Sequence, residues 1–529
     1  MRRILALILC AALLLCGCSG VKNAAGFSRV VKFSDMVYVR PDLEEAEQAA
    51  QEAVEAARES RSADAVMEAV WAFYEVYNAF LTNSNLAYIR YHADLNDIYW
   101  QGEEEFCAEK APQLEMYLED IYCAIAESDL CGELEEEYFE PGWFDSYREG
   151  EFYDEQLLAL MEREQDLIGE YYTLTAGGQD LEEAQYYDAC TEPMLGVLAQ
   201  LVRVRRELAQ YTGYDSYTDF AWDFYYYRDY TPAQAEEYLE TIRTDLVPVY
   251  RQMVQLDVFG AAETACSEQA VYEYVKKTAE AMGGEAWEAF RLMEEAELYD
   301  IGADTCKSGL SFETYLPTYY QPFVFLSGTG TRYDCLAFAH EFGHFATDYA
   351  AGGTGAGIDV LEIFSQAMEL LSLEYGQADE ALADLKLADC LCTYVEQAAY
   401  ARFELELYAM ADEALTAEGI LERYEQICTA YGCDYDGWDP RELITVPHFF
   451  SNPMHIISYV VSNDAALQLY QLELAEPGSG RDIYLQSLDT QQAFFLAFLQ
   501  EAGLQSPFGR VDSVRALMEA RFGSSEGDS

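Results

Sequence analysis

Two histidines one helical turn apart, with a glutamate beside the first, form the strongest chemical signal in the chain. His340, Glu341 and His344 stand in the order His-Glu-x-x-His. On a helix the two imidazoles share one face and can bind one divalent metal, usually zinc, while Glu341 can reach a water on that metal. With five histidines in 529 residues, chance predicts only about 0.01 such patterns, counting Asp and Glu alike. The alternative is a buried helix with two satisfied histidines.

A third ligand is expected from a helix that follows the glycine-rich loop at 352–357. Catalytic zinc sites use three protein ligands and a water. Glu362 and Glu369 lie seven residues apart on an otherwise apolar helical face, where an unpaired carboxylate would be costly. We predict Glu362 as the ligand, and either Asp359 or Glu369 as the group that orients a ligand histidine through its free N–H. Alternatively, these are helix-end or surface acids.

Two further histidines and a tyrosine follow near the C-terminal end. His448 and His455 are seven residues apart, and Tyr459 comes four residues later. Peptide hydrolysis passes through a tetrahedral oxyanion, which neutral histidine or tyrosine donors can stabilise. We therefore predict catalytic roles for His448 and Tyr459 and a substrate-binding role for His455. The alternative is a helix whose polar residues pack in the core.

A short apolar run at 322–326 is typical of a strand that ends in a tight turn. It directly precedes the predicted metal helix. As an edge strand it could bind an extended substrate backbone by strand addition. This predicts substrate contacts at Phe323, Phe325, Gly328 and Gly330. The alternative is a core strand without a role in binding.

Helical periodicity dominates the rest of the chain, and strand-like runs are rare. The predicted helices are 43–60, 66–93 with a break near 83–85, 103–128, 155–173, 181–211, 233–256, 267–282 and 286–297. We predict a mainly α fold with an N-terminal helical region at 41–200 and a catalytic region at 201–525.

Composition and charge narrow the function classes. The chain is 51% hydrophobic, which is enough for a large core. Its net charge of −65 excludes binding to nucleic-acid phosphates. Such acidity attracts cationic peptides, or it is simply a solvated surface.

Residues 1–18 are predicted to be a lipoprotein-type signal peptide. Arg2 and Arg3 precede an apolar segment at 4–15 that is too short to span a bilayer. The segment runs into Leu-Cys-Gly-Cys-Ser, which resembles a bacterial lipobox. By that resemblance Cys18 would carry lipid and attach the protein to a membrane, and residues 19–40 would be a tether. A plain secretory signal is the alternative.

Export would permit disulfides among the eleven cysteines that follow Cys18. Cys390 and Cys392 are too close for an easy bridge within one helix, whereas Cys428 and Cys433 could pair across a turn. The scattered spacing leaves free thiols as an equal alternative.

Five ordered pieces of the chain resemble the thimet oligopeptidase/oligoendopeptidase F family of zinc metallopeptidases, most closely its oligoendopeptidase F branch. They are 206–221, 322–331, 339–344, 359–369 and 447–459. The resemblance extends over about 200–520. It implies a multi-helical, ellipsoidal fold with a small β element beside a deep central channel that admits short peptides.

The resemblance also implies roles for individual residues. One zinc ion per chain would be bound by His340, His344 and Glu362. Glu341 would be the base. His448 and Tyr459 would face the transition state. The family usually has tyrosine at the position of His455 and often histidine at that of Thr347. The spacing from His344 to Glu362 is also shorter than is common. These departures concern substrate preference more than the metal site.

The sequence therefore predicts a zinc-dependent endo/oligopeptidase that hydrolyses short peptides and is held outside the cytoplasm by lipid; its oligomeric state is open. The alternative is a lipid-anchored extracytoplasmic peptide- or solute-binding protein without catalysis. Glu341 argues against that alternative, because a binding protein has no use for a general base.

Overall fold

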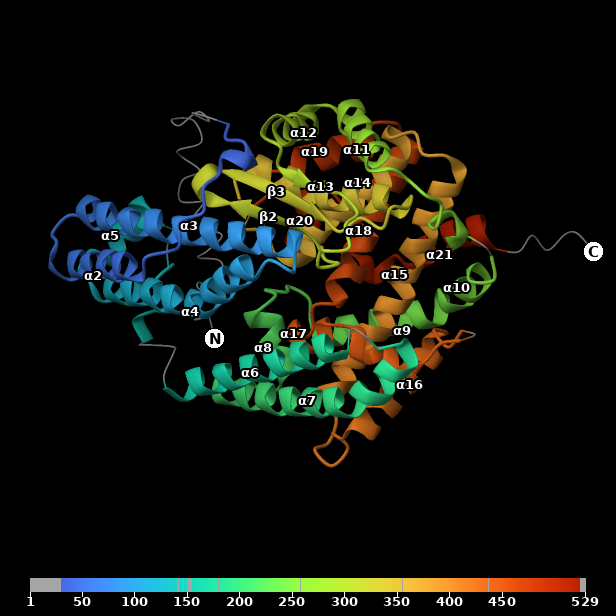
Figure 1. The fold of residues 1–529 in the computed structure, drawn as a ribbon, viewed down its shortest axis with the longest axis horizontal. Coiled ribbons are helices and arrows are strands. Elements are labelled where there is room, and N and C mark those ends of the chain that lie inside the picture. Colours follow the sequence, from blue (N-terminus) through green and yellow to red (C-terminus); the bar gives the residue numbers. More distant parts are fainter. Residues whose placement is uncertain are drawn as a thin grey trace, which may run out of the picture.

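The computed structural model describes residues 30–139, 142–145, 147–149, 155–178, 181–256, 258–353, 355–435 and 437–523. The predicted signal peptide, Cys18 and residues 19–29 of the predicted tether lie outside these ranges. Within them, helices account for most of the chain and one small sheet is present (Figure 1). The predicted fold class, mainly α with a small β element, is confirmed. In the same ranges, no helix combines the length and the apolar character needed to cross a membrane.

Four N-terminal helices pack around a hydrophobic core of their own, which extends from Ala50 to Tyr147 (Figure 1, blue to teal). They are α2 (Leu43–Glu59), α3 (Ala63–Ala93), α4 (Ile98–Glu127) and α5 (Cys131–Glu137). The predicted break near 83–85 is wrong, because α3 runs through it. The Asn83 side chain donates to the carbonyl of Ala79, and that of Asn85 donates to the carbonyl of Tyr315, so both amides find acceptors within a continuous helix.

The next helices belong to the large core that also contains the C-terminal half. They are α6 (Glu155–Gly178), α7 (Glu183–Tyr211), α8 (Tyr217–Phe224), α9 (Pro232–Asp245), α10 (Val247–Met253), α11 (Glu268–Met282) and α12 (Gly284–Ala296). The predicted helix at 233–256 is divided at Leu246, since Pro248 offers no N–H to continue it. The large core also includes Met36, Leu86 and Ile89, so the two cores adjoin along α3.

The sheet has three strands in the order β1-β3-β2, formed by β1 (Tyr299–Asp300), β2 (Ser311–Leu316) and β3 (Gln321–Leu326). β3 pairs parallel with β1 and antiparallel with β2. The expectation of an edge strand at 322–326 is therefore wrong, and the exposed fractions of Phe323 and Phe325 are only 1% and 0%. A continuous apolar run is typical of a strand that is covered on both faces.

The C-terminal half begins with the two helices that carry the predicted metal ligands. Its helices are α13 (Tyr333–Ala351), α14 (Ile358–Tyr375), α15 (Glu380–Leu407), α16 (Ala417–Tyr431), α17 (His448–Ser451), α18 (Ile457–Ala475), α19 (Ser479–Ser487), α20 (Phe495–Glu501) and α21 (Val511–Phe522). α13 ends at Gly352, whose φ of 72° gives the left-handed cap that glycine tolerates best. The eleven cysteines within the described ranges are all free thiols, Cys428 and Cys433 included.

Candidate active site

The three predicted metal ligands converge where α13 packs against α14. Nε2 of His340 lies 3.6 Å from Oε2 of Glu362, and Nε2 of His344 lies 3.9 Å from Oε1 of the same carboxylate. One ligand atom from each residue lies within 4.8 Å of the others. The arrangement follows from helical geometry, because residues 340 and 344 occupy one face of α13.

Gly343 permits the close approach of the two helices. A Cβ atom at this position would lie 2.6 Å from Cα of Ser365 and 2.7 Å from the carbonyl oxygen of Phe364. Any larger residue between the two histidines would force α14 away from α13. Glu362, one turn before Ser365, would then move out of reach of the imidazoles.

The donor set fits a zinc ion. Bond lengths of 2.0–2.2 Å in a tetrahedral site place ligand atoms roughly 3.4 Å apart. The distances of 3.6 and 3.9 Å from the two oxygens of Glu362 to the imidazoles are near that value, and with one ligand atom per residue the three atoms lie within 4.8 Å of one another. Two imidazole nitrogens and one carboxylate oxygen are also a typical catalytic zinc set, which leaves the fourth position for water.

Glu369, and not Asp359, contacts one of the predicted ligand histidines. Nδ1 of His340 lies 2.8 Å from Oε1 of Glu369, so Nε2 is left for the metal. The other oxygen of Glu369 accepts a hydrogen bond of 2.7 Å from Lys386, which also pairs with Asp389 at 2.8 Å. Burial would raise the pKa of Glu369, but Lys386 and His340 together hold it below its usual value. Glu369 therefore stays an anion that can orient the ring of His340.

Lys386 was not predicted from the sequence. It is a buried lysine on α15 in a chain that has only 31 lysines and arginines against 96 acidic residues. A cation between Leu385 and Leu387 on a helix is the signal that could have identified it, because a buried charge requires a partner.

The pKa values of the two histidines diverge. Burial lowers the pKa of His340, but the hydrogen bond to Glu369 and the charges of Glu362 and Glu341 outweigh it and raise the value to about 9. Burial and the neighbouring His340 lower the pKa of His344 to about 3. The carboxylates around His340 thus favour its charged form, whereas burial favours the neutral form of His344.

Glu341 lies at the wall of a pocket of about 390 Å³ that His340, Glu369 and Tyr459 also line. Its exposed fraction is 8%. Burial and the nearby carboxylates raise its pKa to about 7, although His340 opposes the shift. A carboxylate with a pKa near the working pH is suited to accept and return a proton.

The strand that borders the pocket is β2, whose first residue, Ser311, is part of the pocket wall. The carbonyl of Leu310 faces β3, where it accepts from the N–H of Ser327. By the alternation of an antiparallel ladder, the backbone groups of residues 311, 313 and 315 face away from β3. The Asn85 amide donates to the carbonyl of Tyr315 and occupies that end of the edge. The other end, at Ser311, lies at the pocket.

Gly328 and Gly330 belong to a turn that precedes α13. The carboxylate of Asp334 accepts hydrogen bonds from the N–H groups of Thr329 and Gly330, at 2.9 and 2.8 Å. A Cβ at Gly328 would lie 3.1 Å from the carbonyl oxygen of Ile301. These glycines fix the start of the metal helix, and neither they nor Phe323 and Phe325 are part of the pocket wall.

His448, His455 and Tyr459 form a cluster of three rings. The hydroxyl of Tyr459 lies 3.3 Å from Nε2 of His448, and the ring of His455 lies 5.1 Å from each of the other two. Burial lowers the pKa of His448. Burial and the neighbouring His448 lower the pKa of His455 to about 3. Burial raises the pKa of Tyr459. All three side chains are thus neutral at pH 7, and Tyr459 is the one that reaches the pocket wall.

Two buried side chains that the sequence did not indicate hold α17 and the segment that follows it. Arg205 of α7 donates to the carbonyls of Phe449 and Phe450, next to His448. Glu404 of α15 accepts a 2.8 Å hydrogen bond from the N–H of Met454, next to His455. The positions of both histidines therefore depend on helices far away in the sequence.

Comparison with known proteins identifies both the N-terminal region and the fold. Residues 33–144 match the family described as the peptidase M3 N-terminal domain. No curated protein sequence matches the chain.

Solved structures match nearly the whole chain. A structure assigned to oligoendopeptidase F has 23% identity and a TM-score of 0.80, and covers 94% of this chain and 99% of its own. PZ peptidase A with an inhibitor has 22% identity and a TM-score of 0.79, and covers 94% and 100%. A structure assigned to oligoendopeptidase F from Bacillus anthracis str. Ames has 22% identity and a TM-score of 0.76, and covers 94% and 99%. The family resemblance read from the sequence is thus confirmed: the chain has a peptidase M3 N-terminal domain match at 33–144 and the fold of the oligoendopeptidase F structures.

Proposed function

We propose that the protein is a zinc-dependent oligopeptidase that hydrolyses peptide bonds in short peptides. The observation that carries this proposal is the convergence of His340, His344 and Glu362 beside a pocket that Glu341 and Tyr459 line. The M3 domain match and the oligoendopeptidase fold support a peptidase independently of that geometry.

Each residue at the pocket would have a distinct task. Zinc, when bound, would polarise the scissile carbonyl and lower the pKa of its water toward about 7. Glu341 would accept the proton of the attacking water and return it to the leaving amine, a role worth roughly 10² to 10⁴ in rate. Tyr459, kept protonated by burial, would donate to the developing oxyanion. His448, whose Nε2 lies 3.3 Å from the Tyr459 hydroxyl, would keep that hydroxyl directed at the oxyanion. Loss of an oxyanion donor such as Tyr459 lowers the rate by a factor on the order of 10² or more.

The edge of β2 is the surface that suits an extended substrate. Its first residue, Ser311, lines the pocket, and the backbone groups of residues 311 and 313 face away from β3, so strand addition along this edge would align a peptide across the site. The strand-addition role that the sequence suggested for β3 is thus proposed for β2 instead. A pocket of about 390 Å³ accommodates a few side chains of an extended peptide, and a folded domain cannot enter it.

The proposal is tested with purified protein and a quenched fluorescent peptide. We expect cleavage that a chelator abolishes and that added zinc restores, because the site residues supply no other route to an activated water. Mass spectrometry of the products confirms that a peptide bond has been hydrolysed. Binding of the peptide without cleavage, at full zinc occupancy, would instead support the non-catalytic binding protein.

We also propose that the protein is exported and carries lipid at Cys18, from the basic, apolar and cysteine-containing pattern of residues 2–18. Cells that express the wild-type chain should incorporate labelled palmitate into it, and Cys18→Ala should abolish the label. Cys16→Ala is the matched control, since Cys16 lies in the same segment two residues earlier and should leave labelling intact. Equal labelling of wild type and Cys18→Ala would contradict the proposal.

A further inference from the structure

A buried ion pair between Arg228 and Asp359, together with Ser458, connects the start of α14, which carries Glu362, to the start of α18, which carries Tyr459. Arg228 donates from Nε to Oδ2 of Asp359 at 3.2 Å and from Nη2 to Oδ1 at 3.4 Å. The same Nη2 donates to the hydroxyl of Ser458 at 2.9 Å, and Ser458 donates to Oδ1 of Asp359. Asp359 lies in the first turn of α14, three residues before Glu362, and Ser458 directly precedes Tyr459 in α18.

Arg228 is held rigidly in the segment between α8 and α9. The rings of Trp222 and Tyr226 lie 4.4 and 4.3 Å from its guanidinium carbon, and its N–H donates to the carbonyl of Trp222. The preceding residue, Tyr227, has a φ of 49°, a conformation that non-glycine residues rarely adopt and that surrounding contacts must maintain. The side chain of Arg228 is 0% exposed. Its position is therefore determined by several independent contacts.

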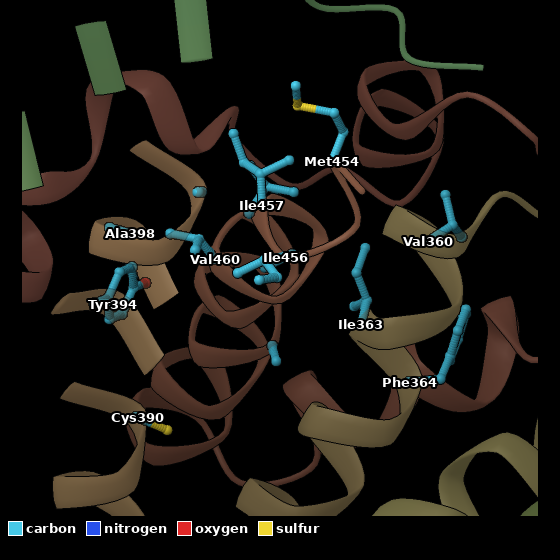
Figure 2. Close-up of a cluster of buried hydrophobic side chains, with 14 of the residues drawn as sticks. Val360, Ile363, Phe364, Cys390, Tyr394, Ala398, Met454, Ile456, Ile457 and Val460 are labelled. Atoms are coloured by element: carbon cyan, nitrogen blue, oxygen red, sulfur yellow. The ribbon is translucent and has the colours of Figure 1, made fainter. Parts of the chain in front are cut away.

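The contact between α14 and α18 does not need this ion pair for cohesion. Figure 2 shows Val360 and Ile363 of α14 in one apolar cluster with Ile457 and Val460 of α18. Apolar contacts are non-directional, so they hold two helices together without fixing their register. Burying an arginine and an aspartate is costly, and apolar residues of similar volume are often at least as stabilising. Directional hydrogen bonds add a geometric constraint that apolar contacts alone do not supply.

Two more polar links lie along the same helix pair. The hydroxyl of Ser462 donates to the carbonyl of Asp359 at 2.6 Å, and the amide of Gln366 donates to the carbonyl of Tyr459 at 3.3 Å. Together with the Arg228 links, they fix the rotation and the register of the first turns of α18 against α14. Glu362 and Tyr459 stand on those turns.

We propose that Arg228 and Ser458 are positioning residues that set the place of the Tyr459 hydroxyl relative to Glu362. The inference rests on the proposed peptidase function. Neither residue touches the substrate pocket. Both act through Tyr459, and a displacement of that phenol by about 1 Å would cost as much as 100-fold in rate.

The test removes the link to α18 and leaves the Arg228–Asp359 pair in place. We expect Ser458→Ala to lower kcat about tenfold while KM changes less than about twofold, because the donor acts mainly in the transition state. In a Tyr459→Phe background the same substitution should have no further effect, since the group that Ser458 positions is absent. Ser458→Cys, which keeps the volume and donates only weakly, is the second variant in case the alanine variant does not fold.

Thr278→Val is the matched control. Thr278 is fully buried and its hydroxyl donates to the carbonyl of Tyr274 within its own helix, α11, away from the pocket. The kcat of Thr278→Val should equal that of the wild type. An unchanged kcat in the Ser458 variants, or an equal loss with and without the Tyr459 hydroxyl, would overturn the inference.

Amide hydrogen exchange of residues 456–462 in metal-free protein provides a readout that does not require activity. Exchange in this segment should be faster in Ser458→Ala than in the wild type and unchanged in Thr278→Val. Equal exchange in all three proteins would overturn the inference. A wild-type protein that cleaves no peptide would refute the proposed function separately, and the exchange measurement would still decide whether Ser458 fixes α18.

Discussion

Glu341→Gln is expected to retain zinc and to lose nearly all peptidase activity. The amide occupies the volume of the carboxylate, so the neighbouring ligands His340 and His344 keep their positions. It cannot accept the proton of the attacking water, and we expect kcat to fall by roughly 10² to 10⁴. Metal analysis and hydrolysis of a quenched peptide, measured on the same preparation, separate the two effects.

Glu374→Gln is the matched control for this substitution. Glu374 lies on the exposed side of α14 and accepts a 3.4 Å hydrogen bond from Tyr470. The chemical change is identical, but the residue is not part of the pocket wall, so kcat should stay at the wild-type value. Full activity of Glu341→Gln would remove Glu341 from its role as the base.

His344→Ala is expected to lose both zinc and turnover. Two of the three protein ligands remain, and the Glu362 carboxylate loses one of the two imidazoles that it faces. Loss of an outer partner of a ligand typically weakens metal binding by about 10- to 100-fold, so loss of the ligand itself should exceed that range. The zinc affinity of the apo-protein, measured by competition with a chromogenic chelator, gives the size of the loss.

His92→Ala controls for the removal of a histidine as such. His92 lies in α3 and packs against Tyr88 and Phe312, so it should leave one zinc bound per chain. An apo-protein of His344→Ala that still binds one zinc with wild-type affinity would contradict the ligand assignment, whatever its activity.

The metal-site motif was accessible from the sequence because its geometry is local. The spacing of His340 and His344 already places both imidazoles on one face of any helix. Glu362 was accessible for a different reason, namely that an acid on an apolar helical face needs a cationic partner. Which of Asp359 and Glu369 contacts His340 could not be predicted from the sequence. It depends on Lys386 and Arg228, and the Arg228–Asp359 contact spans 131 positions of the chain.

Two of the failed predictions depended on long-range packing, whereas the division of the helix predicted at 233–256 follows from Pro248, a local signal. The break expected near Asn83 and Asn85 is absent, and the carbonyl of Tyr315, 230 positions away, accepts a hydrogen bond from the Asn85 amide. The edge strand expected at 322–326 became the central strand because β1, only two residues long, pairs with its other side. A two-residue strand has no periodicity that a sequence could reveal.

By itself the sequence determined the helical fold class, the apolar faces of its helices and a pair of histidines with a glutamate at metal-binding spacing, because each depends on periodicities of a few residues. Only the tertiary structure decided which acid orients His340, which strand borders the pocket and how α18 is set against α14. Those features depend on directional hydrogen bonds and ion pairs between segments far apart in the chain. Their partners are chosen by packing, and no local pattern records that choice.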